Sequence, residues 1–375
     1  MTRSTVPGSP RDVANVAGSA RSAGPGGTPG SPRDVANLAG SARSATAIAH
    51  PNIALAKYWG KRAGEGNIPA VPSLSVTLAG MSTTTTVSFD DTLVDDELEL
   101  NGVPAAGSRP KARASQLLDR VRLAANTTTR ARIVSSNDFP TASGLASSAS
   151  GFAALALAAV RAAGLDWSAQ QVADLARRSS ASAARSVFGG FVELDGGESE
   201  DGTPSLGVAR PVADAAAIDL RVLVCVTTED AKATSSTDGM RLTQHSSPYY
   251  AAWLADAPAS QRAIREALLA GDFVRLGELS ERSALAMHAC AMAAGIVYVT
   301  GATLSILQHV RALRAAGLPA FGTIDAGPHL KCLVRSGDAA AARESLERLP
   351  GVLRIIDTSP GEGARIVEPT PGAAS

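Results

Sequence analysis

The sequence has few aromatic residues and carries no net charge. Aromatic side chains make up only 4% of the 375 residues, although the hydrophobic fraction reaches 45%, so small apolar side chains must fill much of the core. Thirty-five basic residues balance thirty-five acidic ones. Neither nucleic acid nor an anionic membrane surface is therefore expected as the main partner.

Cysteine is also scarce, and the three cysteines (Cys225, Cys290 and Cys332) are far apart without a CxxC spacing. An odd number without paired spacing predicts buried thiols in a reducing compartment, and argues against a disulfide framework or a zinc site. The five histidines show no H-E-x-x-H spacing. We therefore predict no metal site built from protein side chains.

Long apolar runs are missing. The strongest one, around residues 151–160, is too short to span a bilayer, and the N-terminus lacks the apolar core of a signal peptide. We expect a cytoplasmic protein. A chain of this length also exceeds a usual single core, which favours two domains.

The first 45 residues contain a duplication, because residues 8–23 recur almost unchanged as residues 30–45. Two copies are too few to bury the continuous core of a solenoid. The segment is rich in Gly, Ser, Pro and Ala and has no large side chains to offset the entropy of ordering. We predict a disordered tail over residues 1–45, and a second short tail over 369–375.

The remaining sequence alternates between strand and helix patterns. Period-two and β-branched patterns predict strands over 46–54, 75–78, 83–89, 97–100, 129–134, 186–194, 220–226, 321–325, 330–334 and 355–358. Amphipathic or alanine-rich patterns predict helices over 111–125, 144–163, 168–180 and 339–349, the last with Asp338 as N-cap, and several more between 249 and 316. Mixed elements in both halves predict an α+β fold with domains over 46–215 and 216–368.

Residues 140–151 form a loop of small residues that leads into an alanine-rich helix. Small side chains let a phosphate approach the backbone amides and the positive end of the helix dipole. The string lacks the pattern of a Walker loop. A serine-rich helix cap would look the same, so the loop alone leaves both interpretations open.

A cluster of aromatic and cationic residues follows the first predicted strand, in the order Lys57, Tyr58, Trp59, Gly60 and Lys61. Adjacent aromatic rings and lysines suit an anionic ligand on one side and a packed core on the other, although a solvated basic turn is common. A large ring beside glycine indicates a shaped backbone, which favours the ligand site.

Two further residues are candidates for chemistry. Arg185 lies among serines and alanines, where its guanidinium could pair with a carboxylate or simply close a helix end. Asp325 ends a predicted strand before a Gly-Pro turn, where a carboxylate can act as a base or cap the turn.

Together and in this order, the motifs resemble those of the diphosphomevalonate decarboxylases, in the superfamily of galactokinase, homoserine kinase, mevalonate kinase and phosphomevalonate kinase (GHMP kinases). The resemblance covers residues 46–368. Its motifs are Asn52-x4-Lys-Tyr-Trp-Gly-Lys-Arg62, Ser73-Leu-Ser-Val-Thr-Leu78, Asn137-Asp-Phe-Pro-Thr-Ala-Ser-Gly-Leu-Ala-Ser-Ser148, Ser182-Ala-Ala-Arg-Ser-Val-Phe-Gly-Gly190, Ser235-Ser-Thr-Asp-Gly-Met240 and Asp325-Ala-Gly-Pro328.

The resemblance implies a ribosomal-S5-like N-terminal domain, a ferredoxin-like C-terminal domain and an active site between them. It implies that ATP with Mg²⁺ phosphorylates the C3 hydroxyl of 5-diphosphomevalonate, and that phosphate and CO2 then leave to give isopentenyl diphosphate. It also implies a homodimer. The metal would be held mostly by phosphates and water.

Residue roles follow by motif position. The resemblance implies that Asp325 faces the C3 hydroxyl as base or electrostatic stabiliser, that Arg185, supported by Asn52, orients the substrate carboxylate, and that Lys57 lies near the reacting groups. The implied substrate-binding residues are Tyr58, Trp59, Gly60, Lys61, Ser180, Ala181, Ser182, Ala183, Ala184 and Thr237. The implied ATP-binding residues are Ser143, Gly144, Leu145, Ala146, Ser147 and Ser148.

Three positions depart from the family pattern. Ala181 stands in place of the usual glycine, His329 in place of the usual asparagine, and Thr237 where some members carry a longer cation. These departures leave open the alternative that the chain decarboxylates 5-phosphomevalonate. Two further hypotheses are a mevalonate 3-kinase and a catalytically silent binding protein of the same fold, and retention of Lys57, Arg185 and Asp325 argues against both.

Overall fold

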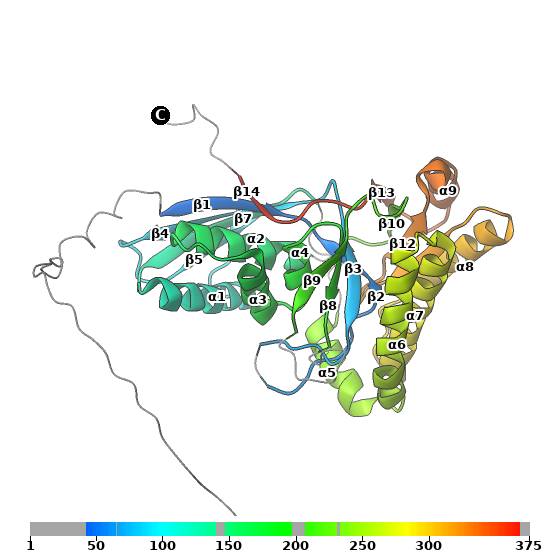
Figure 1. Ribbon diagram of the computed structural model, residues 1–375, viewed down its shortest axis with the longest axis horizontal. Coiled ribbons are helices and arrows are strands. Elements are labelled where there is room, and N and C mark those ends of the chain that lie inside the picture. The colour runs from blue at the N-terminus through cyan, green and yellow to red at the C-terminus, as the bar shows by residue number, and fades with distance from the viewer. Residues whose placement is uncertain (1–42, 65, 140–146, 197–206, 231–232, 368–375) are drawn as a thin grey trace, which may run out of the picture. The chain divides into compact units, whose positions relative to one another are not determined.

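The computed structural model describes residues 43–64, 66–139, 147–196, 207–230 and 233–367, and these form an α+β fold with three sheets (Figure 1). The predicted tails at 1–45 and 369–375 lie almost wholly outside the described residues. The exception is the start of β1, which begins at Ser44, two residues before the predicted start of the ordered chain.

The largest sheet has six strands, with α1 (Arg109–Ala125), α2 (Ser147–Ala162) and α3 (Ala169–Ser179) on one face (Figure 1). The strand order is β14 (Arg365–Val367), β1 (Ser44–Ala49), β4 (Thr83–Asp90), β7 (Arg130–Asn137), β5 (Glu97–Leu100) and β6 (Val103–Pro104). Side chains of β4 alternate between buried and half-buried, which is why this threonine-rich segment forms a strand with one face on the core.

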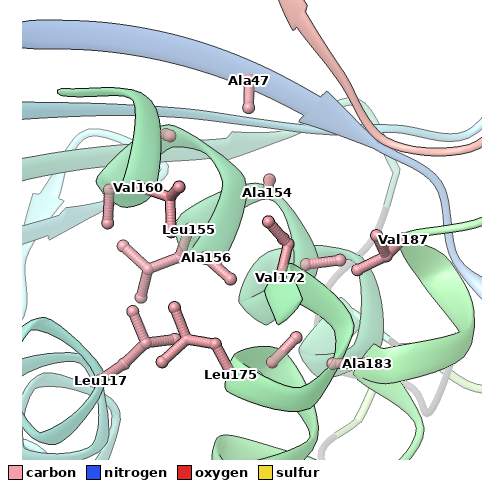
Figure 2. Packing of buried hydrophobic residues seen from close by; sticks show 14 of the residues in the cluster. Ala47, Leu117, Ala154, Leu155, Ala156, Val160, Val172, Leu175, Ala183 and Val187 are labelled. Atoms are coloured by element: carbon pink, nitrogen blue, oxygen red, sulfur yellow. The ribbon is translucent and has the colours of Figure 1, made fainter. Parts of the chain in front are cut away.

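Helix α2 is the centre of the core beneath this sheet. Figure 2 shows Ala154, Leu155 and Val160 of this helix among side chains from neighbouring elements, including Val172 of α3. The alanines let helix and sheet approach closely, which explains how a chain with few aromatic residues fills its interior.

A second sheet has the order β2-β3-β8-β9, and the short helix α4 (Ala183–Ser186) precedes β8. Its strands are β2 (Asn52–Ala56), β3 (Ser73–Thr77), β8 (Phe191–Leu194) and β9 (Ala209–Ala213). All residues of β2 and β3 are buried. Strands buried on both faces can hold a polar side chain rigidly inside the protein.

The third sheet is formed by the C-terminal part of the chain, in the order β11 (Phe321–Ile324), β12 (Leu330–Val334), β10 (Arg221–Val226) and β13 (Arg354–Thr358). The helices of this part of the chain are α5 (Ser236–Ser246), α6 (Tyr250–Leu269), α7 (Phe273–Ala293), α8 (Gly301–Ala315) and α9 (Ala339–Glu347), and α7, α8 and α9 contact the sheet. One hydrophobic cluster joins α6, α7 and this sheet to β2 and β3. Another joins α8 and α9 to the opposite face.

Several predicted boundaries need correction. The strand predicted over 46–54 is two strands in different sheets, because Pro51 has no N–H to continue a ladder. The strand predicted over 186–194 begins only at Phe191, after α4 and a turn at Gly190 with φ of +65°. Asp338 does precede α9, but its side chain makes no capping hydrogen bond, because a short 3-10 turn leads into the helix.

The buried pair Asp96–Arg122 should be important for stability. Each Asp96 oxygen accepts from Arg122 at 3.0 Å, and the backbone N–H of Ala131 donates to Oδ1 at 3.0 Å. Replacing Asp96 with asparagine leaves a buried guanidinium poorly compensated, which should lower the free energy of unfolding by about 3 kcal/mol. Urea denaturation measures the loss. Asp119→Asn removes an exposed partner of the same arginine and should cost about 1 kcal/mol or less; equal losses would contradict this account.

Candidate active site

Asp325 lies between two buried lysines. Its Oδ1 accepts from Lys57 Nζ at 2.6 Å, and its Oδ2 lies 3.1 Å from Lys331 Nζ. The lysine side chains are 1% and 2% exposed, whereas that of Asp325 is 26% exposed. The carboxylate is therefore held by buried cations while part of it remains open to an approaching molecule.

The three residues come from different elements of the fold. Asp325 follows β11, and its carbonyl accepts from the Gly327 N–H at 2.7 Å in the turn towards β12. Lys57 follows β2 after a register shift near Ala54, and its Nζ donates to the Ala54 carbonyl at 2.7 Å. The Lys57 backbone N–H donates to Ser283 of α7 at 3.0 Å. The ion pair thus joins the first half of the chain to the C-terminal sheet.

Burial and charge act in opposite directions on these groups. Burial alone would raise the pKa of Asp325, but the ammoniums of Lys331 and Lys57 hold that pKa well below its usual range. Burial lowers the pKa of Lys57, although Asp325 opposes the shift. Asp325 is therefore ionised at neutral pH and is a weak proton acceptor.

Arg185 forms the second part of the site, held in one orientation by polar side chains. Its Nε donates to Asn52 Oδ1 at 3.3 Å, and its Nη1 donates to Ser73 Oγ at 2.6 Å. Asn52 Nδ2 in turn donates to the Ser182 carbonyl at 3.0 Å and to Ser186 Oγ at 2.7 Å. These two contacts leave other N–H donors of the guanidinium to bind a planar carboxylate.

Charge links Arg185 to its neighbours. Burial lowers the pKa of Arg185 to about 10, while Tyr58 and Asp325 oppose that shift. Burial raises the pKa of Tyr58, whose hydroxyl is buried without a hydrogen-bond partner among the described residues. The structure therefore brings together Asn52, Lys57, Tyr58, Arg185 and Asp325 as the sequence predicts.

Trp59 and Gly60 set the shape of the backbone. The Trp59 ring is 1% exposed and packs edge-on against Tyr298, with centroids 5.8 Å apart, while its carbonyl accepts from Trp253 at 2.7 Å. Gly60 has φ of +116°, and a Cβ there would lie 2.2 Å from the Tyr250 hydroxyl. Both residues therefore fix the turn that carries Lys57 and Lys61, and the Trp59 side chain belongs to the core.

Lys61 lies in a separate group of cations. Its Nζ donates to Asn67 Oδ1 at 2.7 Å and to Thr237 Oγ1 at 3.2 Å, at the first turn of α5. Burial, with Arg113 and Arg109 adding repulsion, lowers the pKa of Lys61 to about 8. An anion bound here would relieve that repulsion, and the N-terminus of α5 would favour it further.

The segment before α4 contains the serines and alanines that the resemblance implies for substrate binding. The Ser180 and Ser182 hydroxyls lie 3.4 Å apart. Ala181, Ala183 and Ala184 are buried in the core cluster, and Figure 2 shows Ala183 there beside α3. The Cβ of Ala181 therefore packs into the core. Among the described non-glycine residues only three asparagines have positive φ, so Ala181 needs no backbone conformation reserved for glycine.

The predicted nucleotide loop is only partly described. Ser143, Gly144, Leu145 and Ala146 lie outside the described residues, while Ser147 and Ser148 begin α2. Ser148 is exposed at this helix start, where backbone N–H groups favour a phosphate.

Comparisons with known proteins identify the family. The diphosphomevalonate decarboxylase-like N-terminal domain matches residues 49–206, and the mevalonate 5-diphosphate decarboxylase C-terminal domain matches residues 222–361. The chain belongs to the diphosphomevalonate decarboxylase family. A diphosphomevalonate decarboxylase from Candida albicans is 35% identical over 76% of this chain and 82% of its own length. A phosphomevalonate decarboxylase from Haloferax volcanii is 36% identical over 76% and 86%.

Solved structures of this family confirm the two-domain GHMP-kinase-like fold. Mevalonate diphosphate decarboxylase from Staphylococcus aureus is 37% identical, covers 87% of this chain and 98% of its own, and has a TM-score of 0.81. A related structure in complex with MVAPP, AMPPCP and magnesium is 38% identical, covers 87% and 99%, and has a TM-score of 0.78.

Lys331 was not predicted from the sequence as a neighbour of Asp325. The sequence does contain an indication of it: a lysine stands within the apolar strand Leu330–Val334, where an unpaired charge would be costly. The departure at His329 has a structural explanation, because its Nδ1 accepts from the backbone N–H of Thr227 at 3.2 Å. His329 thus joins the turn after Asp325 to the end of β10.

Within the described part of the chain, no group of three or more His, Cys, Asp or Glu side chains is placed to hold a metal ion. The described helices also include none that is long and apolar enough to cross a membrane. All three cysteines are free and buried.

Proposed function

We propose that this chain catalyses the ATP-dependent decarboxylation of 5-diphosphomevalonate to isopentenyl diphosphate, with release of ADP, phosphate and CO2. The observation that carries the proposal is the buried Lys57–Asp325–Lys331 group joined by charge to the fixed Arg185. A kinase that stops after phosphorylation needs no fixed cation for a departing carboxylate. Family membership and the matching solved structures support the same reaction.

The chemistry proceeds by turning a poor leaving group into a good one. The γ-phosphoryl group of ATP passes to the C3 oxygen, the hydroxyl proton is released to water and ADP is left. The C3–O bond then breaks with its electron pair on phosphate. The electrons of the C–C bond to the carboxylate form the new double bond, and CO2 leaves. Positive charge builds at C3 as phosphate departs, so a nearby carboxylate lowers the barrier.

Asp325 suits the stabilising role. Both its oxygens already accept from ammoniums, and its pKa lies well below the usual range, so it would be a weak base. We propose that it accepts the hydrogen bond of the C3 hydroxyl and then faces the developing positive charge. Arg185 would hold the substrate carboxylate in the orientation that CO2 loss requires.

The residues present fit a magnesium ion that arrives with the nucleotide. Mg²⁺ prefers phosphate oxygens and water, so it needs no dense carboxylate set, and Ser147 and Ser148 would hold the phosphates that carry it. When bound, the ion neutralises phosphate charge. We also propose domain boundaries near 215, since the two family domains end and begin at residues 206 and 222.

We further propose a cytoplasmic homodimer. The three free, buried cysteines support a reducing compartment. The dimer follows from the family resemblance, and light scattering of the purified protein tests it.

The experiment for the proposed function measures ATP- and Mg²⁺-dependent CO2 release from 5-diphosphomevalonate and from 5-phosphomevalonate. The group of Lys61, Arg109 and Arg113 favours the more highly charged substrate. We expect kcat/KM for the diphosphate to exceed that for the monophosphate by about 100-fold or more. Faster turnover of the monophosphate would indicate a phosphomevalonate decarboxylase, like the Haloferax volcanii relative. Formation of ADP without CO2 would indicate a 3-kinase.

Lys61→Met should narrow this preference. The substitution removes an ammonium from the proposed diphosphate position while leaving Asp325 and Arg185 in place. We expect KM for 5-diphosphomevalonate to rise about tenfold or more, since one charge-assisted hydrogen bond contributes about 1.5–3 kcal/mol, with a smaller change in kcat. Steady-state kinetics with both substrates measure the effect. An unchanged substrate ratio would place the phosphates elsewhere.

A further inference from the structure

Lys331 is fixed in the middle of the C-terminal sheet. Strand β12 lies between β11 and β10, and Lys331 pairs in register with Thr323 on one side and Val224 on the other. Its neighbours Leu330 and Cys332 belong to the cluster under α8 and α9, so Lys331 projects to the opposite face of the sheet. The strand therefore aims one ammonium at the loop that carries Asp325.

We propose that Lys331 is a positioning residue, whose ammonium holds the Asp325 carboxylate ionised and oriented for the reaction at C3. The inference rests on the proposed decarboxylation. The two Asp325 oxygens are divided between the lysines, Oδ1 to Lys57 and Oδ2 to Lys331. One lysine alone would leave the carboxylate free to rotate about its bond, whereas two contacts on different oxygens fix its plane.

If Lys331 stabilises the Asp325 carboxylate, Lys57 need not supply all of the stabilising charge. Lys57 already donates to the Ala54 carbonyl, so only part of its hydrogen-bonding capacity serves Asp325. Lys331 supplies the remaining charge from the sheet side, where a substrate bound near Lys57 and Arg185 would not displace it. The carboxylate then stays ionised when Lys57 engages the reacting groups.

Other titratable groups near this centre remain in one state around neutral pH. Besides Lys57 and Asp325, the groups that interact with Lys331 include His288 and Cys225. Burial, with Lys57 adding repulsion, lowers the pKa of His288 to about 4, and burial raises the pKa of Cys225 to about 12. Arg185 keeps its charge. Lys57 and Lys61 both have a pKa of about 8, so the alkaline limb of a pH profile reports on these two lysines, whereas Asp325 titrates below this range and needs a titration of its own.

The test uses the variants Lys331→Met and Lys331→Gln, the second of which keeps a hydrogen-bond donor but not the charge. Removing the Lys331 ammonium leaves less positive charge to oppose the effect of burial, so the pKa of Asp325, which lies well below the usual range, should rise by about one unit or more. This rise is followed by a direct titration of the carboxyl, and the pH profile of kcat/KM is used only for its alkaline limb. Lys57 loses a repulsive neighbour, so its pKa and the alkaline limb should also move up. Both variants should show these shifts, with kcat at pH 7 about tenfold lower.

Lys111→Met is the matched control, because Lys111 pairs with Asp95 at the surface; this variant should leave the Asp325 titration and the alkaline limb unchanged. A ¹³C-carboxyl NMR titration without substrate, with Asp325→Asn for assignment, measures the pKa of Asp325 directly. This readout separates failure of the inference from failure of the proposed function. An unshifted Asp325 titration in Lys331→Met or in Lys331→Gln would overturn the positioning role.

Discussion

Replacing Asp325 with asparagine should lower kcat for CO2 release by about 1,000-fold, because the variant loses the carboxylate that we propose faces C3 as phosphate leaves. Asparagine is nearly isosteric, so the shape of the site changes little. The variant also leaves the two buried ammoniums of Lys57 and Lys331 without their shared partner. Stopped assays of ¹⁴CO2 from carboxyl-labelled substrate measure the loss.

Nucleotide binding separates this effect from misfolding. The proposed phosphate-binding helix start at Ser147 and Ser148 belongs to a different element, so the Kd for ATP should change by less than about threefold. Asp95→Asn provides a control, since it removes the carboxylate of the surface ion pair between Asp95 and Lys111 and should leave kcat unchanged. Substantial turnover by Asp325→Asn would remove the carboxylate from its proposed role.

Arg185→Lys should lower kcat/KM by about 100-fold or more, although the positive charge is kept. Lysine cannot reproduce the planar fork that binds a carboxylate, and it loses the fixed contacts to Asn52 and Ser73. The reduced rate should appear in kcat as well as in KM, because in our proposal the arginine orients the bond that breaks.

Arg221→Lys is the control for this substitution. Arg221 pairs with Asp357 between β10 and β13, at 2.6 Å, and no hydrogen bond or ion pair joins it to a proposed site residue in the described part of the chain. Its replacement should leave kcat/KM unchanged. A similar loss in both variants would show that the effect of Arg185→Lys is general destabilisation.

The sequence predicts which candidate residues lie near one another, but it misses some elements of the fold. Lys57, Arg185 and Asp325 are recognisable because each stands in an ordered motif, and the structure brings them together. Helix α5 was not predicted, because its serines and threonines resemble a loop, and it is the Ser235 hydroxyl accepting from the Asp238 N–H that starts the helix. Strands β9 and β14 were also missed. Strand β9 is short, contains Pro211 and is mostly exposed or half-buried, and β14 pairs with β1 from the other end of the chain.

Two further features, the position of Lys331 and the packing of Ala181, depend on contacts between residues far apart in the sequence. Nothing near Lys331 in the sequence shows that β12 would place it against Asp325, because that contact depends on the register of β12 with β11. Ala181 is one of the departures that left a monophosphate substrate open, because its family counterpart is glycine. Its buried position shows that the Cβ packs into the core, which only the three-dimensional packing can reveal.

The most direct test of the central claim is the stoichiometry of a single turnover with carboxyl-labelled 5-diphosphomevalonate, ATP and Mg²⁺. Our account predicts equal amounts of ADP, phosphate and labelled CO2, with the label lost at the same rate as phosphate is released. Formation of ADP with the label retained in a phosphorylated product would contradict it, and would make the chain a kinase.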